Sequence, residues 1–404
     1  MYLTREEERI LSGYEGEAKA LAIKTLVKVG EALGAERLIP IKHAHVSGIS
    51  YGTIGEHGLA LLEELVEKGA RVEVPTTVNP IGFDSEEPSL MSRIGVRLDD
   101  EFVKGQMRIV KALRAMGAQT TLTCTPYYLP DTRFLKPGDS VSWGESSAIL
   151  YGNSVIGIRT NREGGPLALM SAIVGKTYYW GLHIDENRKP TTGFKVDHNE
   201  PLDEVMAGLL GKLVAERYAG VRPPYVKVAL RDELAVKEML AAVGAAGSLA
   251  MIYLDGITGP SIDIVKLERF ETIDWRELAS LYEEHKPSEK PDVVFLGCPH
   301  SRAEDLARLA KLLEGKPEPK SKIVITLSRS EYRRFRESYP EYLGVLKEKA
   351  VIVRDTCLIV SPFGRDDSGL TVVTNSYKAY FYLSKRGLKV GLSTIEDMIP
   401  LLYM

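Results

Sequence analysis

Cysteine and glutamine are scarce in this chain of 404 residues. The three cysteines, Cys124, Cys298 and Cys357, are odd in number and widely spaced, which argues against a disulfide framework. The charged start MYLTREEERIL lacks the apolar stretch of a signal peptide, and we therefore expect a reducing, cytoplasmic location. Glutamine occurs only at positions 106 and 119, and this shortage of a heat-labile amide suggests a hot-environment source.

Long apolar runs and an excess of positive charge are also missing. The longest apolar runs, such as VKVAL and SLAMIYL, are as short as strands and fall far below the ~20 residues that cross a membrane. The 52 Lys and Arg residues are balanced by 55 Asp and Glu, which leaves a net charge of −3 and no global basic field. We therefore expect neither a membrane nor a nucleic acid as partner, and an anionic ligand must be held by local contacts.

The size and composition that are present describe a folded protein of several domains. The chain is longer than a single hydrophobic core supports, and 44% hydrophobic with 26% charged residues is typical of a globular protein. Strand-like and helical segments alternate, which predicts an α/β fold with parallel or mixed sheets flanked by helices. Two polar stretches without clear periodicity, IDENRKPTTGFKVDHNEP and EEHKPSEKPD, divide the chain into predicted domains 1–195, 196–287 and 288–404.

Hydrophobic periodicity predicts the elements that carry the polar motifs. In the first domain it predicts two helices within residues 5–33, a strand at 38–47, helices at 59–69 and 101–115, and a strand at 120–124. Alternation along the strand at 38–47 would place His43 and His45 on one face. There, a neutral imidazole would either assist proton transfer or fill the core.

The three cysteines share one local position, at or just after the end of a predicted strand. The segments are TTLTC, DVVFLGC and VIVRDTC, and ligands of α/β proteins bind at this end of strands. Any one of these cysteines alone could equally be a small buried apolar residue. A zinc site normally has four closely spaced ligands, which this sequence does not show. A 4Fe-4S cluster takes one thiolate per iron, so three cysteines would leave one iron open as a Lewis acid, which favours hydro-lyase chemistry over electron transfer.

Two loops that follow predicted strands are candidate anion-binding sites. The backbone amides and hydroxyl of Gly48, Ile49 and Ser50 can hold a phosphate or carboxylate, although a glycine-rich turn explains them as well. Asn79 and Pro80 place an amide side chain on a rigid loop, where a simple turn is the alternative. The glycine spacing does not match a dinucleotide-binding fingerprint.

Charged residues at two predicted helix starts are further candidates. Glu145 and Ser146 begin a helix, where a carboxylate either caps the helix or orients a leaving hydroxyl. Lys378 begins the last long helix, where the helix dipole disfavours a cation, so its charge points to a bound anion. The densest basic cluster is interpreted as a solvated helix face, with partner docking as the alternative; it consists of Arg333, Arg334 and Arg336.

The motifs together resemble the large subunit of the aconitase X family. The resemblance covers essentially the whole chain and rests on HAHVSGISYGTIGEHG, PTTVNPIGFD, LTCTPYYLP, VSWGESSAILYGNSVIG, LGCPHS, DTC and TNSYKAYFYL. It implies an aconitase-like α/β fold without the swivelling domain, which would lie on a separate small subunit in a heterodimer. It also implies a 4Fe-4S cluster held by Cys124, Cys298 and Cys357.

The activity implied by the resemblance is the dehydration of (R)-5-phosphomevalonate to trans-anhydromevalonate 5-phosphate in the archaeal mevalonate pathway of isoprenoid biosynthesis. Family position favours substrate contact for Gly48, Ile49, Ser50, Asn79, Pro80, Glu145, Ser146 and Lys378, with Glu145 and Ser146 catalytic. The general base would then be a serine of the small subunit. Two alternatives stay open: a dehydratase of another small hydroxy acid such as cis-3-hydroxyproline, and a non-catalytic cluster-bearing RNA-binding or regulatory protein.

Overall fold

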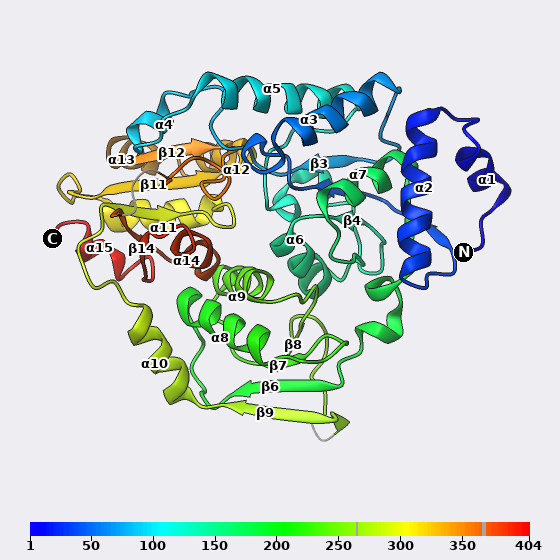
Figure 1. Cartoon of the computed structure of the whole chain (residues 1–404). Coiled ribbons are helices and arrows are strands. Elements are labelled where there is room, and N and C mark those ends of the chain that lie inside the picture. Colours follow the sequence, from blue (N-terminus) through cyan, green and yellow to red (C-terminus); the bar gives the residue numbers. More distant parts are fainter. Residues whose placement is uncertain (264–265, 366–368) are drawn as a thin grey trace.

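A computed structural model describes residues 1–263, 266–365 and 369–404. Figure 1 shows three groups of helices and strands around the middle of the molecule, which we call the first lobe (α1 to β5), the second lobe (β6 to α10) and the third lobe (β10 to α15). Each contains strands and helices, which confirms the predicted α/β fold. In the described ranges, no helix has both the length and the apolar character needed to cross a bilayer.

The first lobe is built on a short parallel sheet in the order β3-β2-β4. Ala44 of β2 pairs with Thr76 of β3 and with Ser142 of β4, so the loops after all three strands emerge at one edge. The strands are β1 (Leu38–Pro40), β2 (Ala44–Val46), β3 (Thr76–Val78), β4 (Ser142–Trp143) and β5 (Lys176–Tyr178). The helices are α1 (Arg5–Leu11), α2 (Glu17–Ala32), α3 (Tyr51–Glu67), α4 (Leu90–Arg93), α5 (Asp100–Ala115), α6 (Ser146–Tyr151) and α7 (Gly165–Val174).

The second lobe has a parallel sheet in the order β8-β7-β6-β9. Its strands are β6 (Thr192–Val196), β7 (Tyr225–Lys227), β8 (Tyr253–Leu254) and β9 (Arg269–Ile273), and its helices are α8 (Glu204–Arg217), α9 (Glu233–Ala246) and α10 (Trp275–His285). Asp203 and Asp232 accept hydrogen bonds from the first free amides of α8 and α9 and so define where these helices begin. Nearly all of α9 is buried, so this helix lies inside the molecule.

The third lobe has a five-stranded parallel sheet in the order β12-β11-β10-β13-β14. Its strands are β10 (Val293–Leu296), β11 (Lys322–Leu327), β12 (Ala350–Arg354), β13 (Thr371–Thr374) and β14 (Lys389–Leu392). The helices are α11 (Ala303–Leu313), α12 (Arg329–Ser338), α13 (Leu343–Lys349), α14 (Tyr377–Ser384) and α15 (Met398–Leu401). The chain runs outward from β10 in both directions, so the crevice beyond β10 and β13 is the place where such a sheet binds ligands.

Two secondary-structure predictions were wrong, and one predicted domain boundary falls inside a strand. Residues 38–47 form two short strands in different sheets, because β1 pairs with β5 and β2 with β3 and β4, and His43 lies between them. Residues 120–124 are a loop, because Leu122 has a φ of 47°, which strand backbone does not adopt, although the backbone amide of Thr123 donates to the carbonyl of Val78 at 3.0 Å. The polar stretch around residue 195 contains β6, so a boundary before Thr192 keeps that strand in its sheet.

The first and third lobes are joined by buried charges. Asp84 of the first lobe is fully buried and accepts hydrogen bonds from Arg329 and Arg354, both at 2.7 Å. Burial disfavours the charged carboxylate, but the hydrogen bonds and positive charges of the two arginines outweigh it and hold the pKa of Asp84 below its usual value. The charged carboxylate therefore locks the loop after β3 against the ends of β11 and β12.

Candidate functional site

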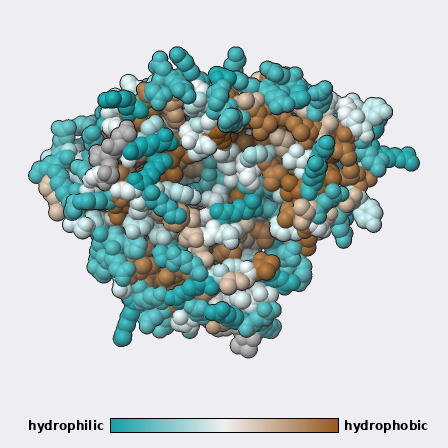
Figure 2. All heavy atoms as spheres, in the orientation of Figure 1, coloured by the Kyte–Doolittle hydropathy of each residue, from teal (hydrophilic) through white to brown (hydrophobic). Residues whose placement is uncertain are grey.

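A pocket of about 390 Å³ lies where the loops of the first and third lobes meet. Figure 2 shows mostly hydrophilic side chains around the rim of the molecule and a hollow near the middle of this face. The pocket is lined by eight residues predicted from the sequence: Asn79, Pro80, Cys124, Glu145, Ser146, Cys298, Cys357 and Lys378. The fold therefore brings together residues that are up to about 300 positions apart in the chain.

The three cysteines come from loops of two different lobes. Cys298 lies two residues after β10 and Cys357 three residues after β12, so both occupy the predicted carboxyl ends of strands. Cys124 lies in the loop that leads into a single 3-10 turn at Pro126–Tyr128. Burial raises the pKa of Cys124 to about 12 and raises those of Cys298 and Cys357 as well, so these thiols hold their protons at neutral pH.

The donor chemistry of this pocket suits an iron–sulfur cluster better than a single metal ion. The three thiols line the same pocket. In the described part of the chain, no group of three or more His, Cys, Asp and Glu side chains is arranged to bind one metal ion. In an iron–sulfur cluster each thiolate binds a separate iron, so the three thiols do not have to converge on one metal ion.

Glu145 and Lys378 form a buried ion pair at the wall of the pocket. Their Oε1 and Nζ atoms lie 2.5 Å apart, and Lys378 is 8% exposed. Burial opposes the charge on Glu145, but the positive charge of Lys378 and the hydrogen bonds from Lys378 and Asn79 outweigh it and lower the pKa to about 2. Burial likewise opposes the ammonium of Lys378, and the carboxylate of Glu145 raises its pKa overall. Both groups are therefore charged at neutral pH.

Glu145 caps a helix, which is one of the two roles that the sequence left open, and it also belongs to the ion pair. It is the N-cap of α6, where its side chain accepts from the amide of Ser147, and it also pairs with Lys378 and Asn79. Ser146 is the first residue of α6, and its hydroxyl donates to Glu145 Oε1 at 3.4 Å. The helix start therefore holds the carboxylate in place while its charge is used in the pocket.

Asn79 connects the ion pair to a histidine behind it. Its Nδ2 donates to Glu145 Oε2 at 2.7 Å, and its Oδ1 accepts from His45 Nε2 at 2.8 Å. His45 Nδ1 then accepts from the hydroxyl of Thr77 at 2.8 Å, because Nε2 already carries the proton. Burial lowers the pKa of His45 to about 4, so this imidazole is neutral and fixes the orientation of the Asn79 amide.

The loop of Gly48, Ile49 and Ser50 lies beside the pocket and is not among its lining residues. Gly48 has a φ of 64°, which favours glycine, and Ser50 is the residue from which α3 begins. The hydroxyl of Ser50 donates to the carbonyl of Val360, which does line the pocket. The carbonyl of Ile49 accepts from Gln106, so the loop is held from both sides.

The remaining candidates from the sequence lie outside the pocket. His43 is buried, and its Nδ1 accepts from Trp143 Nε1 at 3.0 Å, while burial lowers its pKa to about 3. Its ring and that of His45 both lie near Trp143, but neither lines the pocket. In the basic cluster of α12, Arg333 and Arg336 are exposed, and Arg334 pairs with Glu331 at 2.6 Å.

The pocket is also lined by residues that sequence reasoning missed, and five of them have polar side chains: Thr53, Arg162, Glu163, His300 and Tyr382. Arg162 donates to the carbonyls of Gly244 and Gly247 at the end of α9, which ties the pocket to the second lobe. Glu163 accepts from the Tyr178 hydroxyl at 2.7 Å, and burial raises its pKa. A signal that could have found this segment is the charged pair Arg162 and Glu163 just before the glycines that begin α7.

Comparison with known protein families gives matches along almost the whole chain. Family models described as the aconitase X first, second and third domains match residues 1–186, 190–283 and 291–402. A crystal structure of Thermococcus kodakaraensis aconitase X in its holo-form is similar with a TM-score of 0.86 and 37% identity, covering 99% of each chain.

Curated relatives are similar over the same extent. The phosphomevalonate dehydratase large subunit of Aeropyrum pernix is 52% identical, covering 98% of this chain and 99% of that protein. The Methanosarcina mazei protein of the same name is 40% identical over 95% of this chain and 92% of its own. The cis-3-hydroxy-L-proline dehydratase of Pseudomonas aeruginosa is 32% identical over 93% of this chain, which spans 65% of that longer protein.

Proposed function

The chain belongs to the aconitase X family, and from this premise we propose that it is the large subunit of a phosphomevalonate dehydratase. The reaction is the loss of water from (R)-5-phosphomevalonate, giving trans-anhydromevalonate 5-phosphate. Relatives named phosphomevalonate dehydratase large subunit, at 36–52% identity over nearly the full chain, support this substrate over hydroxyproline, whose dehydratases are 30–32% identical.

The observation that carries the proposal is one pocket that holds three thiols and a charged Glu145–Lys378 pair. The thiols of Cys124, Cys298 and Cys357 would hold a 4Fe-4S cluster. When bound, such a cluster supplies a Lewis acid through its iron without a protein ligand, which stabilises charge on a departing hydroxyl. The thiols must first lose their protons, since burial keeps them neutral in the protein alone.

The two charged residues have separate tasks in this reaction. Dehydration removes a proton from the carbon next to the carboxylate, breaks the bond from the next carbon to the hydroxyl oxygen, and forms the alkene between the two carbons. Lys378 would bind the substrate carboxylate or phosphate, because its ammonium faces the pocket and stays charged. Glu145 would accept the hydrogen bond of the substrate hydroxyl and orient it, with Ser146 beside it, since a carboxylate with a pKa of about 2 is a poor proton donor.

The base that removes the carbon-bound proton would come from a small subunit. In the described ranges, the pocket lining contains no neutral histidine except His300, whose ring nitrogens are both hydrogen bonded within the protein. The relatives are named large subunits, which supports a partner chain, and we propose that this partner carries the swivelling domain with the base. The Gly48–Ser50 loop and Asn79–Pro80 would bind the rest of the substrate at the interface.

The test mixes this chain with the small subunit encoded beside it, under anaerobic conditions and after reconstitution with iron and sulfide. Phosphomevalonate is followed by ³¹P and ¹H NMR, and we expect a new alkene signal that requires both chains. A matched reaction contains cis-3-hydroxy-L-proline, which we expect to stay unchanged. Turnover of the hydroxyproline without turnover of phosphomevalonate would contradict the substrate assignment.

A further inference from the structure

His300 contacts all three of the segments that carry the cysteines. It lies two residues after Cys298 and is 1% exposed. Its backbone amide donates to Cys124 Sγ at 3.3 Å, and its Nδ1 lies 3.2 Å from the hydroxyl of Thr123. Its Nε2 lies 2.9 Å from the carbonyl of Thr356, the residue before Cys357. One side chain therefore bridges three loops that are distant in the sequence.

The hydrogen bonds of His300 determine its tautomer and its orientation. The carbonyl of Thr356 can only accept, so Nε2 must carry the proton. Nδ1 then has a free lone pair and accepts from the hydroxyl of Thr123. Because both ring nitrogens are engaged on opposite sides, the ring cannot turn without breaking a buried hydrogen bond, which costs about 1–3 kcal/mol.

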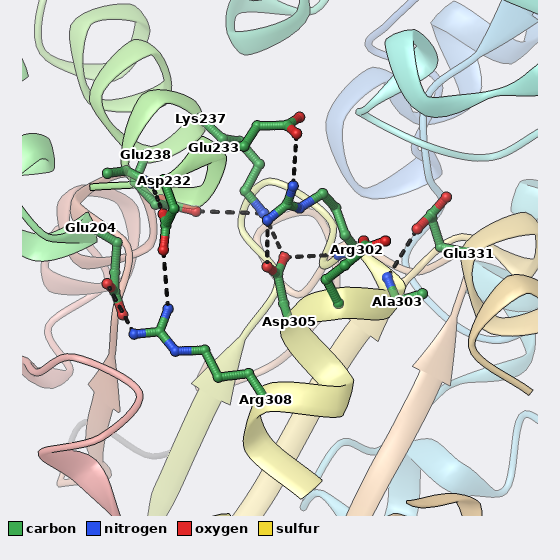
Figure 3. Close-up of polar contacts among 12 residues, drawn as sticks. Glu204, Asp232, Glu233, Lys237, Glu238, Arg302, Ala303, Asp305, Arg308 and Glu331 are labelled. Atoms are coloured by element: carbon green, nitrogen blue, oxygen red, sulfur yellow. Dashed lines mark hydrogen bonds and ion pairs between the residues drawn. The ribbon is translucent and has the colours of Figure 1, made fainter. Parts of the chain in front are cut away.

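Lys237 holds the same loop from the second lobe. This residue of α9 is 2% exposed, and its Nζ donates to the carbonyl of His300 and to Asp305 Oδ2, each at 3.4 Å. Figure 3 shows Lys237 reaching from α9 to Asp305 in the first turn of α11. Asp305 also accepts from the backbone amide of Arg302 at 2.9 Å. Its carboxylate therefore connects Lys237 to the backbone just before α11, where the Cys298 loop ends.

Arg302 links the same turn to all three lobes. Its guanidinium donates to Glu233 of α9 at 2.8 Å and to Asp305 at 3.0 Å. It also lies over the ring of Tyr128, which follows Cys124 in the first lobe, at 5.9 Å from the ring centroid. A buried lysine is costly unless it is paired, and here the pairs converge on the backbone of one cysteine loop. Lys237 and Arg302 therefore both attach the loop that carries Cys298 to α9 of the second lobe.

We propose that His300 and Lys237 are positioning residues that hold the three cysteine loops at fixed separations before a cluster binds. The inference rests on the proposed role of the cysteines as ligands and is independent of the substrate. His300 connects the loops to one another, and Lys237 connects them to the second lobe. A cluster then meets thiols that are already placed, which lowers the ordering cost of binding.

The test measures the thiols of the full chain without iron, under anaerobic conditions. Iodoacetamide labelling followed by peptide mass spectrometry gives a separate rate for each cysteine. We expect H300A to label about tenfold faster at all three cysteines, and K237M to label faster mainly at Cys298 and Cys124. After reconstitution, both variants should lose iron to a chelator about tenfold faster than the wild type.

Two matched controls separate positioning from general loosening. H183A removes another buried histidine, whose Nδ1 is bonded to Ser140 at 3.2 Å and which does not line the pocket. K176M removes a lysine that pairs with Glu7 in the first lobe. We expect wild-type labelling and iron release in both.

Three outcomes would overturn the proposal: wild-type labelling in both H300A and K237M, wild-type iron release in both, or equal acceleration in H183A and K176M. If H300A does not fold, K237M decides alone, since methionine keeps the volume of the lysine stem. If H300A and K237M label faster as expected but the wild-type complex does not dehydrate phosphomevalonate, the proposed substrate fails and the positioning proposal stands, so the two failures are distinguishable.

Discussion

At the scale of single residues, the candidate site depends on charges that burial would otherwise suppress. Glu145 stays ionised because Lys378 and Asn79 compensate for its burial, while the cysteine thiols near Lys378 stay protonated. Glu238, on the neighbouring α9, is the opposite case. Its pKa rises to about 8 because burial outweighs the charge of Lys237. The same low-polarity interior thus produces one charged and one neutral carboxyl group.

Replacing Lys378 tests the ion pair. K378M leaves Glu145 buried without its cation, so substrate binding and the charge of the carboxylate are both lost. We expect the dehydration rate of the reconstituted complex to fall by about 100-fold or more. K212M, which removes a lysine paired with Glu216 on α8 outside the pocket, is the matched control and should keep the wild-type rate. Equal activity of K378M and the wild type would contradict the assignment.

Glu238 predicts a pH dependence of stability. Its folded pKa of about 8 lies above the usual value of 4.5, so the folded state holds its proton more tightly than the unfolded state. The contribution to stability is complete below about pH 4.5 and is lost as the pH rises through 8. The glutamine of E238Q is neutral at every pH. Between pH 5 and 8.5 we therefore expect the free energy of unfolding of E238Q to fall less than that of the wild type, by on the order of 2 kcal/mol. Unfolding of both apoproteins across this range measures it, and parallel curves would contradict the prediction.

At the scale of elements, the positions of the cysteines follow from how strands end. β10 is the central strand of the third sheet, and Gly297 turns the chain from this strand into Cys298. Gly297 has a φ of 113°, and a Cβ atom there would lie 2.1 Å from the carbonyl oxygen of Thr326 on β11. The hydroxyl of Thr326 donates to the carbonyl of Gly297 at 2.8 Å. The turn therefore needs both the left-handed backbone and the close approach of two strands.

Replacing Gly297 tests this turn. G297A combines an unfavourable φ with a backbone clash, and we expect a loss of about 3 kcal/mol of stability together with faster labelling of Cys298. G315A is the matched control, because Gly315 has a φ of 69° and open space around its Cα, so that only about 1 kcal/mol should be lost. Chemical unfolding of the two variants distinguishes the cases. A similar loss in both would show that the approach to Thr326 does not matter.

At the scale of the whole molecule, the pocket exists only because the lobes are held together. Asp84 joins the first lobe to Arg329 and Arg354 of the third lobe. Arg162 joins the pocket to α9 of the second lobe, and Lys237 joins α9 to the Cys298 loop. These charged contacts act together with an apolar cluster that spans the first and third lobes and includes Phe83 and Phe102 of the first and Phe295 and Val324 of the third.

Replacing Asp84 tests the junction of the first and third lobes. D84A removes the buried carboxylate that Arg329 and Arg354 share, while Arg329 keeps its pairs with Glu86 and Asp355 and Arg354 keeps its pair with Glu87. Because the lost carboxylate is the fully buried partner of both arginines, we expect a loss of about 3 kcal/mol. E86A is the matched control, since Glu86 pairs with Arg329 but is exposed, and it should cost at most about 1 kcal/mol. Thermal unfolding of the apoproteins measures both. A D84A protein as stable as E86A would contradict the proposed lock.

Much of the element content was predictable because helix signals are local. The helices at α5, α8 and α9 have apolar residues at helical spacing and an aspartate at the N-cap, so their sequences alone locate them. The strand predicted at residues 120–124 failed because Leu122 adopts a positive φ, and Thr123 contacts Val78 and His300 without continuing a ladder. The boundaries at 195 and 287 stay predictions, the first of them inside β6.

The sequence by itself determined the α/β class, the resemblance to its family, and the three cysteines with Glu145 and Lys378 as candidates, since residue type and local order carry that information. Only the tertiary structure decided that Asn79 links Glu145 to His45, and that His300 and Lys237 reach the cysteine loops. Those contacts join residues far apart in the chain, and hydrophobic periodicity reports only the face that a residue shares with its near neighbours. Which distant side chains meet is set by how the three lobes pack.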